Sequence, residues 1–137
     1  MKKIAGLVIL LLISPVFIPA PAKSTEDTWI KITMPQPGIY LHCNKIMNSR
    51  MYIFIGTDSI HVLTNQSNNI LMVYFAIYNV ITKEMVQGEW DTNGNDGFSY
   101  TFTNLHTGIY AIAAIAAAFD INEPVAFDWI MPVIVIN

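Results

Sequence analysis

Residues 70–78, which read Ile-Leu-Met-Val-Tyr-Phe-Ala-Ile-Tyr, constrain the fold of this chain more than any other stretch. They contain no charge, no glycine and no proline, and they are rich in the β-branched and aromatic side chains that favour strands. Alternation places Val73, Phe75 and Ile77 on one face and two tyrosines and an alanine on the other. Because both faces are apolar, the stretch predicts the centre of a β-sandwich, with a second sheet packed over it.

Similar strand patterns recur at intervals of about 8–12 residues, with turn residues between them, and this spacing is typical of a sandwich. Lys83 and Glu84 indicate that one of these strands is a solvated edge, and Pro132 marks an edge or a bulge in the last one. We therefore expect an all-β, antiparallel β-sandwich of about seven strands. The other strand candidates are residues 29–34, 39–41, 51–55, 59–64, 81–86, 98–103, 109–119 and 125–136.

The alanine-rich segment at 109–119 admits two interpretations. Its alanines favour a helix, and Ile112, Ile115 and Phe119 fit helical spacing. As a strand, it places Ile109, Ile115 and Phe119 on one face. We predict a strand, because the neighbouring segments are strand-like and a helix here would have no obvious sheet to cover.

The beginning of the chain has the pattern of a secretory signal peptide: a basic start, a short apolar run at residues 4–17 and an Ala-x-Ala site ending at Ala22. The alternative is an uncleaved membrane anchor, although the apolar run is shorter than the ~20 residues that span a bilayer. We expect a protein that is secreted or kept in the cell envelope. Its expected parts are a signal peptide at 1–22, a linker at 23–28 and one domain at 29–137.

Charge limits the partners that such a domain can bind. The whole chain has a net charge of −3, and losing Lys2 and Lys3 with the signal peptide leaves −3 − 2, or about −5. An acidic domain is disfavoured as a ligand of nucleic acid or of an anionic membrane surface. We therefore expect no nucleic-acid partner, and membrane contact only through the signal segment if it is uncleaved.

The turn at residues 91–97 holds the strongest candidates for a metal site. Asp91, Asn93, Asn95 and Asp96 present oxygen side chains at a spacing that resembles the first half of a calcium loop. The second half departs from that pattern, because Asp96 stands where the loop needs Gly and the closing Glu is missing. Asn, Asp and Gly also form ordinary hairpin turns, so we predict a turn here, with no metal and no cofactor.

Cys43 is the only cysteine, so it cannot form an internal disulfide; it pairs between chains or is a buried thiol, and its small apolar character favours burial. With His42 it would supply two metal ligands, but neighbouring strand residues point to opposite faces and zinc needs three or four converging ligands. His61 and His106 lie far away in sequence. The chain has no recognisable nucleophile motif and no phosphate-binding loop, so we expect no enzyme activity.

Aromatic side chains are candidates for a sugar-stacking platform, although packing in or around the core is their commoner role. Residues 65–67 match the acceptor pattern for N-linked glycosylation, in a segment that we expect to be a loop. The candidate platform residues are Trp29, Trp90, Trp129, Tyr40, Tyr52 and Tyr78.

Several motifs, taken in order, resemble a prokaryotic immunoglobulin-like domain of secreted and cell-surface proteins. That family tends to show Ile-x-x-Pro-x-x-Gly-hydrophobic-Tyr-Leu, then a Lys-Ile pair, Ile-Gly, a Val-x-Phe strand and a late Ala-Tyr-Asp. The matching residues here are 32–41, Lys45-Ile46, Ile55-Gly56, 73–79 and Ala118-Phe119-Asp120, so the resemblance covers about residues 29–137. A close second resemblance is that of Leu105 to Tyr110 to the Leu-x-x-Gly-x-Tyr corner of transthyretin-like sandwich modules.

The resemblance implies an immunoglobulin-like β-sandwich and says little about activity, because such modules serve as spacers, adhesion units and binding platforms. Our expectation is a non-catalytic module with a structural or interaction role, whose partner is a protein or a cell-surface polymer. The alternative is a small carbohydrate-binding or calcium-dependent adhesin module.

Overall fold

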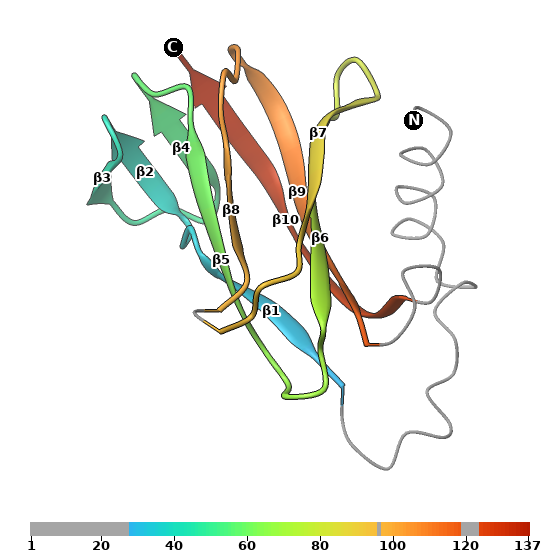
Figure 1. Ribbon diagram of the computed structural model, residues 1–137. Coiled ribbons are helices and arrows are strands. Elements are labelled where there is room, and N and C mark those ends of the chain that lie inside the picture. Colours follow the sequence, from blue (N-terminus) through green and yellow to red (C-terminus); the bar gives the residue numbers. More distant parts are fainter. Residues whose placement is uncertain (1–27, 96, 119–123) are drawn as a thin grey trace.

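The computed structural model describes residues 28–95, 97–118 and 124–137 (Figure 1). Within these ranges the chain forms strands and no helix, and the strands make two packed sheets, which confirms the all-β sandwich. The predicted signal peptide and residues 23–27 of the linker lie outside the described residues. The strands are β1 (Ile30–Met34), β2 (Gly38–Leu41), β3 (Asn44–Met47), β4 (Tyr52–Ile55), β5 (Ile60–Gln66), β6 (Met72–Asn79), β7 (Glu84–Asp91), β8 (Ser99–Phe102), β9 (Gly108–Ala117) and β10 (Pro124–Ile136).

The smaller sheet has the order β1-β5-β8, and the larger has the order β3-β2-β4-β10-β9-β6-β7. The stretch that we expected at the centre is β6, and it lies between β9 and the edge strand β7. The middle position of the larger sheet belongs to β10, which is also the longest strand. The apolar residues of the stretch therefore predicted a strand with two apolar faces. They did not predict its position in the sheet, which depends on pairing with other strands.

Alternation within β6 sets the core as predicted. Val73, Phe75 and Ile77 are fully buried between the sheets, where they meet side chains from the smaller sheet such as Val62 and Phe102. Burial of one such side chain stabilises the fold by about 1.5–3 kcal/mol relative to its exposure. The core is thus made by the inner faces of both sheets.

The alanine-rich segment is a strand, β9, which confirms the prediction over residues 109–117; Phe119 lies outside the described residues. It pairs antiparallel with β6 on one side and with β10 on the other. Ile112, Ala114 and Ala116 face the core and are buried. Hydrogen bonding to two neighbours and burial of both faces from Ile112 to Ala117 outweigh the helical preference of alanine, which is at most ~0.7 kcal/mol per residue against ordinary residues.

The β2–β3 hairpin is the element that the sequence did not predict. Its two-residue turn is formed by His42 and Cys43, with φ angles of 49° and 70°, which fit the type I′ turn that joins twisted strands. Asn-Gly usually marks such a turn, and its absence hid the hairpin. The prediction of a buried thiol is wrong, because the turn exposes Cys43.

The larger sheet also contains two parallel pairs, both made by β4. β4 pairs parallel with β2 and parallel with β10, whereas every other pair in the two sheets is antiparallel. Ten strands are present among the described residues where about seven were expected, and β3 is the one for which the sequence offered no candidate. It forms the edge of the larger sheet beside β2 and β4 (Figure 1).

Two smaller predictions can be compared with the strands. The register of β9 and β10 shifts between Ile130 and Val133, which confirms a bulge at Pro132. β7 is an edge strand as expected, but it begins at Glu84 because Lys83 adopts a left-handed φ of 59° in the preceding turn. No helix among the described residues is long and apolar enough to cross a membrane.

Polar side chains join the two sheets at both sides of the sandwich. On one side, the Ile32 N–H in β1 donates a 2.8 Å hydrogen bond to Asp128 Oδ2 in β10. On the other, Gln87 in β7 donates through Nε2 to the Thr103 carbonyl, just after β8. Hydrogen bonds to a charged acceptor are the stronger kind, at about 1.5–3 kcal/mol.

Candidate interaction surface

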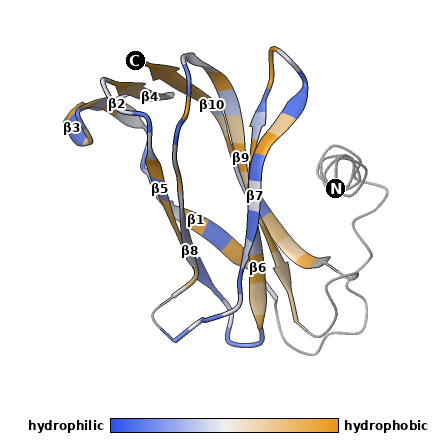
Figure 2. Cartoon of the chain, turned by 45° about the horizontal axis from the view of Figure 1, so that its top comes forward, coloured by the Kyte–Doolittle hydropathy of each residue, from blue (hydrophilic) through white to orange (hydrophobic). Residues whose placement is uncertain are grey.

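The outer faces of the two sheets differ in chemistry. On the smaller sheet, the register pairs Lys31 with Asn65 and His61 with Thr101, and all four side chains are exposed and polar. This is the ordinary pattern of a sheet with one face in the core and one in water. The outer face of the larger sheet departs from it, because the residues that alternate with its core positions are mostly apolar or aromatic. Figure 2 shows little blue along the ribbons of β4, β9 and β10 in this sheet.

One row of aligned residues crosses five strands of the larger sheet. Ile39 pairs with Met47 and Ile53, Ile134 pairs with Ile53, and Ile109 pairs with Ile134. These residues alternate with Tyr40, Phe54, Val133, Val135 and Tyr110, which belong to the core, so they point outward.

A second row, one step along the same strands, consists of Leu41, Ile55 and Ile136. Together with Trp129 of β10, the two rows form a surface that we call the apolar face. Its members are Ile39, Leu41, Met47, Ile53, Ile55, Ile109, Trp129, Ile134 and Ile136.

Four members of the apolar face are exposed, the other five are half-buried, and none is charged. Met47 is 59% exposed, Trp129 is 47%, Ile136 is 46% and Leu41 is 40%. Single exposed apolar residues are normal on a protein, but a contiguous patch of them marks an interaction site or an aggregation risk. The alignment of the members over five adjacent strands makes this the contiguous case.

The outer face continues over β9, β6 and β7 with aromatic side chains. Tyr74 pairs with Trp90 on one side and with Ile115 on the other, and the Tyr74 and Trp90 rings lie 5.0 Å apart at 58°. Burial raises the pKa of Tyr74, and the nearby Glu89 carboxylate raises it further. A Cβ added at Gly88 would lie 2.1 Å from the Tyr74 hydroxyl, so the glycine makes room for this ring.

The structure brings together only part of the predicted aromatic platform. Trp90, Trp129 and Tyr78 lie on β7, β10 and β6 of the larger sheet, on its outer side. Tyr40 stacks on Phe54 in the core, with ring centroids 4.7 Å apart and planes at 8°. Two more members stand apart from the outer face: Tyr52 packs against the core and Trp29 precedes β1.

The acidic turn after β7 uses its oxygens on its own backbone. Asp91 Oδ1 accepts the Asn93 N–H at 3.0 Å and Oδ2 accepts the Ser99 N–H at 2.9 Å. Asn93 Oδ1 accepts the Asn95 N–H at 3.2 Å, whereas Asp96 lies outside the described residues. The bonds within residues 91–95 are those of successive Asx turns, so the predicted turn is present. The predicted hairpin is wrong, because β7 and β8 belong to different sheets and this turn connects the two sheets. Among the described residues, no three His, Cys, Asp or Glu side chains gather where they would hold a metal ion.

His42 and Cys43 are turn residues, so the strand alternation used to separate them does not apply. His42 Nδ1 lies 3.1 Å from the Gly56 carbonyl oxygen, and the Cys43 thiol donates to Thr57 Oγ1 at 3.3 Å. Gly56 adopts a φ of +75°, and a Cβ there would lie 2.7 Å from the His42 ring. The contacts of His42 and Cys43 therefore pack the β2–β3 hairpin against the β4–β5 loop. His61 lies apart from them on the polar outer face, with Nδ1 2.7 Å from Thr101 Oγ1.

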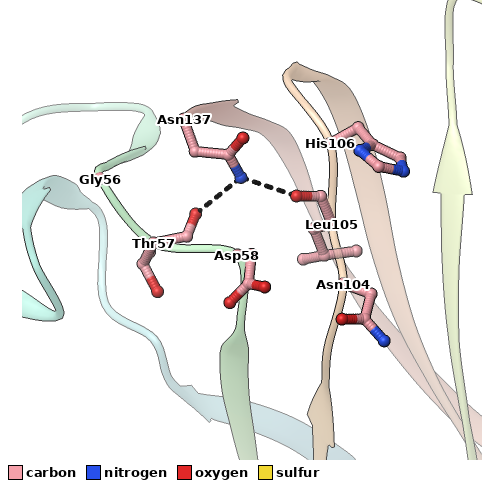
Figure 3. Close-up of a pocket in the computed structure, with 7 residues that line it drawn as sticks. All are labelled: Gly56, Thr57, Asp58, Asn104, Leu105, His106 and Asn137. Atoms are coloured by element: carbon pink, nitrogen blue, oxygen red, sulfur yellow. Dashed lines mark hydrogen bonds between the residues drawn. The ribbon is translucent and has the colours of Figure 1, made fainter.

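A polar pocket of about 450 Å³ opens beside this loop, at one end of the sandwich (Figure 3). The side-chain amide of Asn137 donates to the Thr57 carbonyl at 3.2 Å and to the Leu105 carbonyl at 2.7 Å. Thr107 Oγ1 accepts the Asn137 N–H at 3.1 Å. Asn137, the residue that follows β10, thus links the β4–β5 loop to the β8–β9 loop. Asp58, Asn104 and His106 also line the pocket.

Residue 65 of the glycosylation pattern lies within β5 rather than in a loop, and its side chain is exposed. The apolar face itself was not predicted. Its signal is the pair of Ile-rich segments in β4 and β10, but their alignment depends on parallel pairing between distant strands. A comparison with known protein families and with curated proteins finds no match to this chain.

Proposed function

We propose that this chain is an exported, non-catalytic interaction module of the immunoglobulin-like class that binds a protein through its apolar face. The observation that carries the proposal is the unbroken apolar row from Met47 to Ile109 on the outer side of the larger sheet. Enrichment in apolar and aromatic side chains without charge is typical of the central part of protein interfaces.

Strand order supports the immunoglobulin-like class. The order β10-β9-β6-β7 corresponds to strands G, F, C and C′ of that fold, and β1-β5-β8 corresponds to A, B and E. The hydroxyl of Tyr110, near the start of β9, bonds the backbone four residues earlier, as in the tyrosine corner at the start of strand F. Export rests on the basic start, the apolar run and the Ala-x-Ala site of the first 22 residues.

A photo-crosslinking experiment tests the proposed interaction. A photoreactive amino acid replaces Trp129 on the apolar face, or His61 on the polar outer face as the matched control, in cells that express the full chain. We expect crosslinks to protein from position 129 and few from position 61. Absence of protein crosslinks from 129, or equal yields from both positions, would contradict the proposal.

A second candidate function is carbohydrate binding, favoured by the presence of Trp90, Trp129 and Tyr78 on one outer face. Aromatic rings on a flat sheet suit stacking against sugar rings. A glycan array tests it with the full chain beside its Trp90→Ala and Trp129→Ala variants. Retention of a glycan by the parent chain and its loss in both variants would support this function, and no retained glycan would remove it.

A further inference from the structure

We infer that the apolar face is occupied by a second copy of this chain, in a symmetric dimer that packs the two larger sheets against each other. The inference rests on the proposed function, since it names the protein partner of the same face. Most soluble oligomers are symmetric homo-oligomers, and a two-fold dimer uses one patch twice.

The absence of charge on the apolar face favours this occupant. Every member is aliphatic or aromatic, so two copies bring no like charges together when the face meets itself. The exposed charges lie at its edge or farther away, as with Lys45 on the edge strand β3, Lys31 on the smaller sheet and Glu84 on β7. An anionic lipid surface is less suitable, because the chain carries a net charge of −3, and within the described part of the chain only Lys45 and Arg50 supply positive charge beside this edge of the sheet.

The dimensions of the sheet also fit. Seven strands at ~4.8 Å spacing make it about 29 Å wide, and an average strand of ~7 residues is about 24 Å long. The product, roughly 700 Å², is the footprint of the whole outer face, in which the aromatic side chains of β6 and β7 continue the five-strand apolar face. This footprint is close to the ~800 Å² that each partner buries in a stable interface. Two identical sheets also share one twist, which suits face-to-face packing at about 30°.

Sedimentation equilibrium of the full chain, purified as its host leaves it, tests the dimer over the micromolar range. The parent chain should sediment with the mass of two chains. Ile134→Lys places a positive charge in the centre of the apolar face of each copy, and the two charges face each other across the dimer. The variant should therefore raise the dissociation constant by more than about 100-fold. His61→Lys adds the same charge on the polar outer face and should leave the dimer intact.

Circular dichroism and urea unfolding test whether Ile134→Lys remains folded. If the variant is unfolded, crosslinking of the parent chain decides whether the dimer exists. For that measurement, unlabelled and ¹⁵N-labelled chains carrying the photoreactive group at position 134 are mixed. Crosslinked pairs with one labelled and one unlabelled chain support the dimer. A monomeric parent chain, or a dimeric and folded Ile134→Lys variant, overturns it.

The crosslinked product separates failure of the dimer from failure of the proposed function. A product with another protein keeps the interaction module and rejects the second copy. A product within one chain, to the apolar segment 4–17, rejects the dimer by showing that the chain covers its own face. Absence of any protein product rejects both.

Discussion

The hydroxyl of Tyr110 donates a 2.7 Å hydrogen bond to the backbone carbonyl of His106, four residues earlier. The same relationship occurs at the start of β2, where the Tyr40 hydroxyl donates to the Gln36 carbonyl, also at 2.7 Å. Both tyrosines end a Gly-Ile-Tyr sequence and both are buried in the core. Each bond fixes the path by which a loop enters a strand of the larger sheet.

Replacing Tyr110 by Phe should therefore destabilise the fold. The change keeps the ring in the core and leaves the His106 carbonyl without this donor, so we expect the free energy of unfolding to fall by about 1–2 kcal/mol. Urea unfolding followed by circular dichroism measures the loss. Tyr78→Phe on the outer face is the control, because the Tyr78 hydroxyl has no partner among the described residues, and a similar loss in both variants would argue against the corner.

Replacing Asp128 by Ala should weaken the contact between the two sheets beside β1. The change removes the carboxylate that accepts the Ile32 N–H, and we expect a loss of about 1.5–3 kcal/mol in the free energy of unfolding. The exposed Glu84→Ala in β7 removes the same charge without that bond and should change stability by less than about 0.5 kcal/mol. Equal stabilities for the two variants would show that the bond contributes nothing.

Alkaline pH should weaken the fold through three tyrosines. Burial raises the pKa of Tyr40 and of Tyr74, and burial together with the nearby Asp128 carboxylate raises the pKa of Tyr52. A phenol whose pKa is higher in the folded state stays protonated there while the unfolded chain ionises. Its stabilising contribution is complete below pH 10 and is lost as the pH rises through the folded-state pKa.

The measurement is the urea midpoint as a function of pH. We expect a plateau near neutral pH and a decline that begins at about pH 10. Tyr52→Phe should make the decline shallower than in the parent chain. A midpoint that stays constant up to pH 12 would contradict the raised pKa values.

Calcium should not stabilise the turn after β7. Both carboxylate oxygens of Asp91 already accept backbone N–H groups, from Asn93 and Ser99, so coordination of an ion would compete with these bonds. We expect no change in melting temperature between millimolar calcium and chelator. Asp91→Ala should lower the free energy of unfolding by about 1.5–3 kcal/mol in both conditions, and a calcium-dependent rise in the parent chain would restore the metal hypothesis.

Period-2 alternation predicted the parts of the fold that depend on one strand at a time. The buried triad Val73, Phe75 and Ile77 and the bulge at Pro132 follow from local patterns. The β-conformation of the alanine segment was predicted from its strand-like neighbours, against a local preference for helix. The β2–β3 hairpin does not follow from a local pattern, because His42 and Cys43 adopt left-handed angles that neither residue type favours. Their conformation is maintained by contacts with Gly56 and Thr57, which the sequence does not place beside them.

The candidate surface depends even more on pairing between distant strands. Ile53 and Ile134 are 81 positions apart, and only the parallel register of β4 and β10 makes them neighbours. The sequence showed apolar residues on both sides of several strands, and it could not show that their outward members would align. The aromatic platform was only partly predicted for the same reason, since Tyr40 and Tyr52 turn inward while Trp90 and Trp129 turn outward.

The contrast between the two outer faces has a consequence for how this protein meets its surroundings. Whatever covers the apolar side leaves Lys31, His61 and Asn65 pointing away from the contact. Under the proposed interaction, the chain would bind through its apolar face and present its polar outer face to water, so the assembly would expose less apolar surface than the isolated chain.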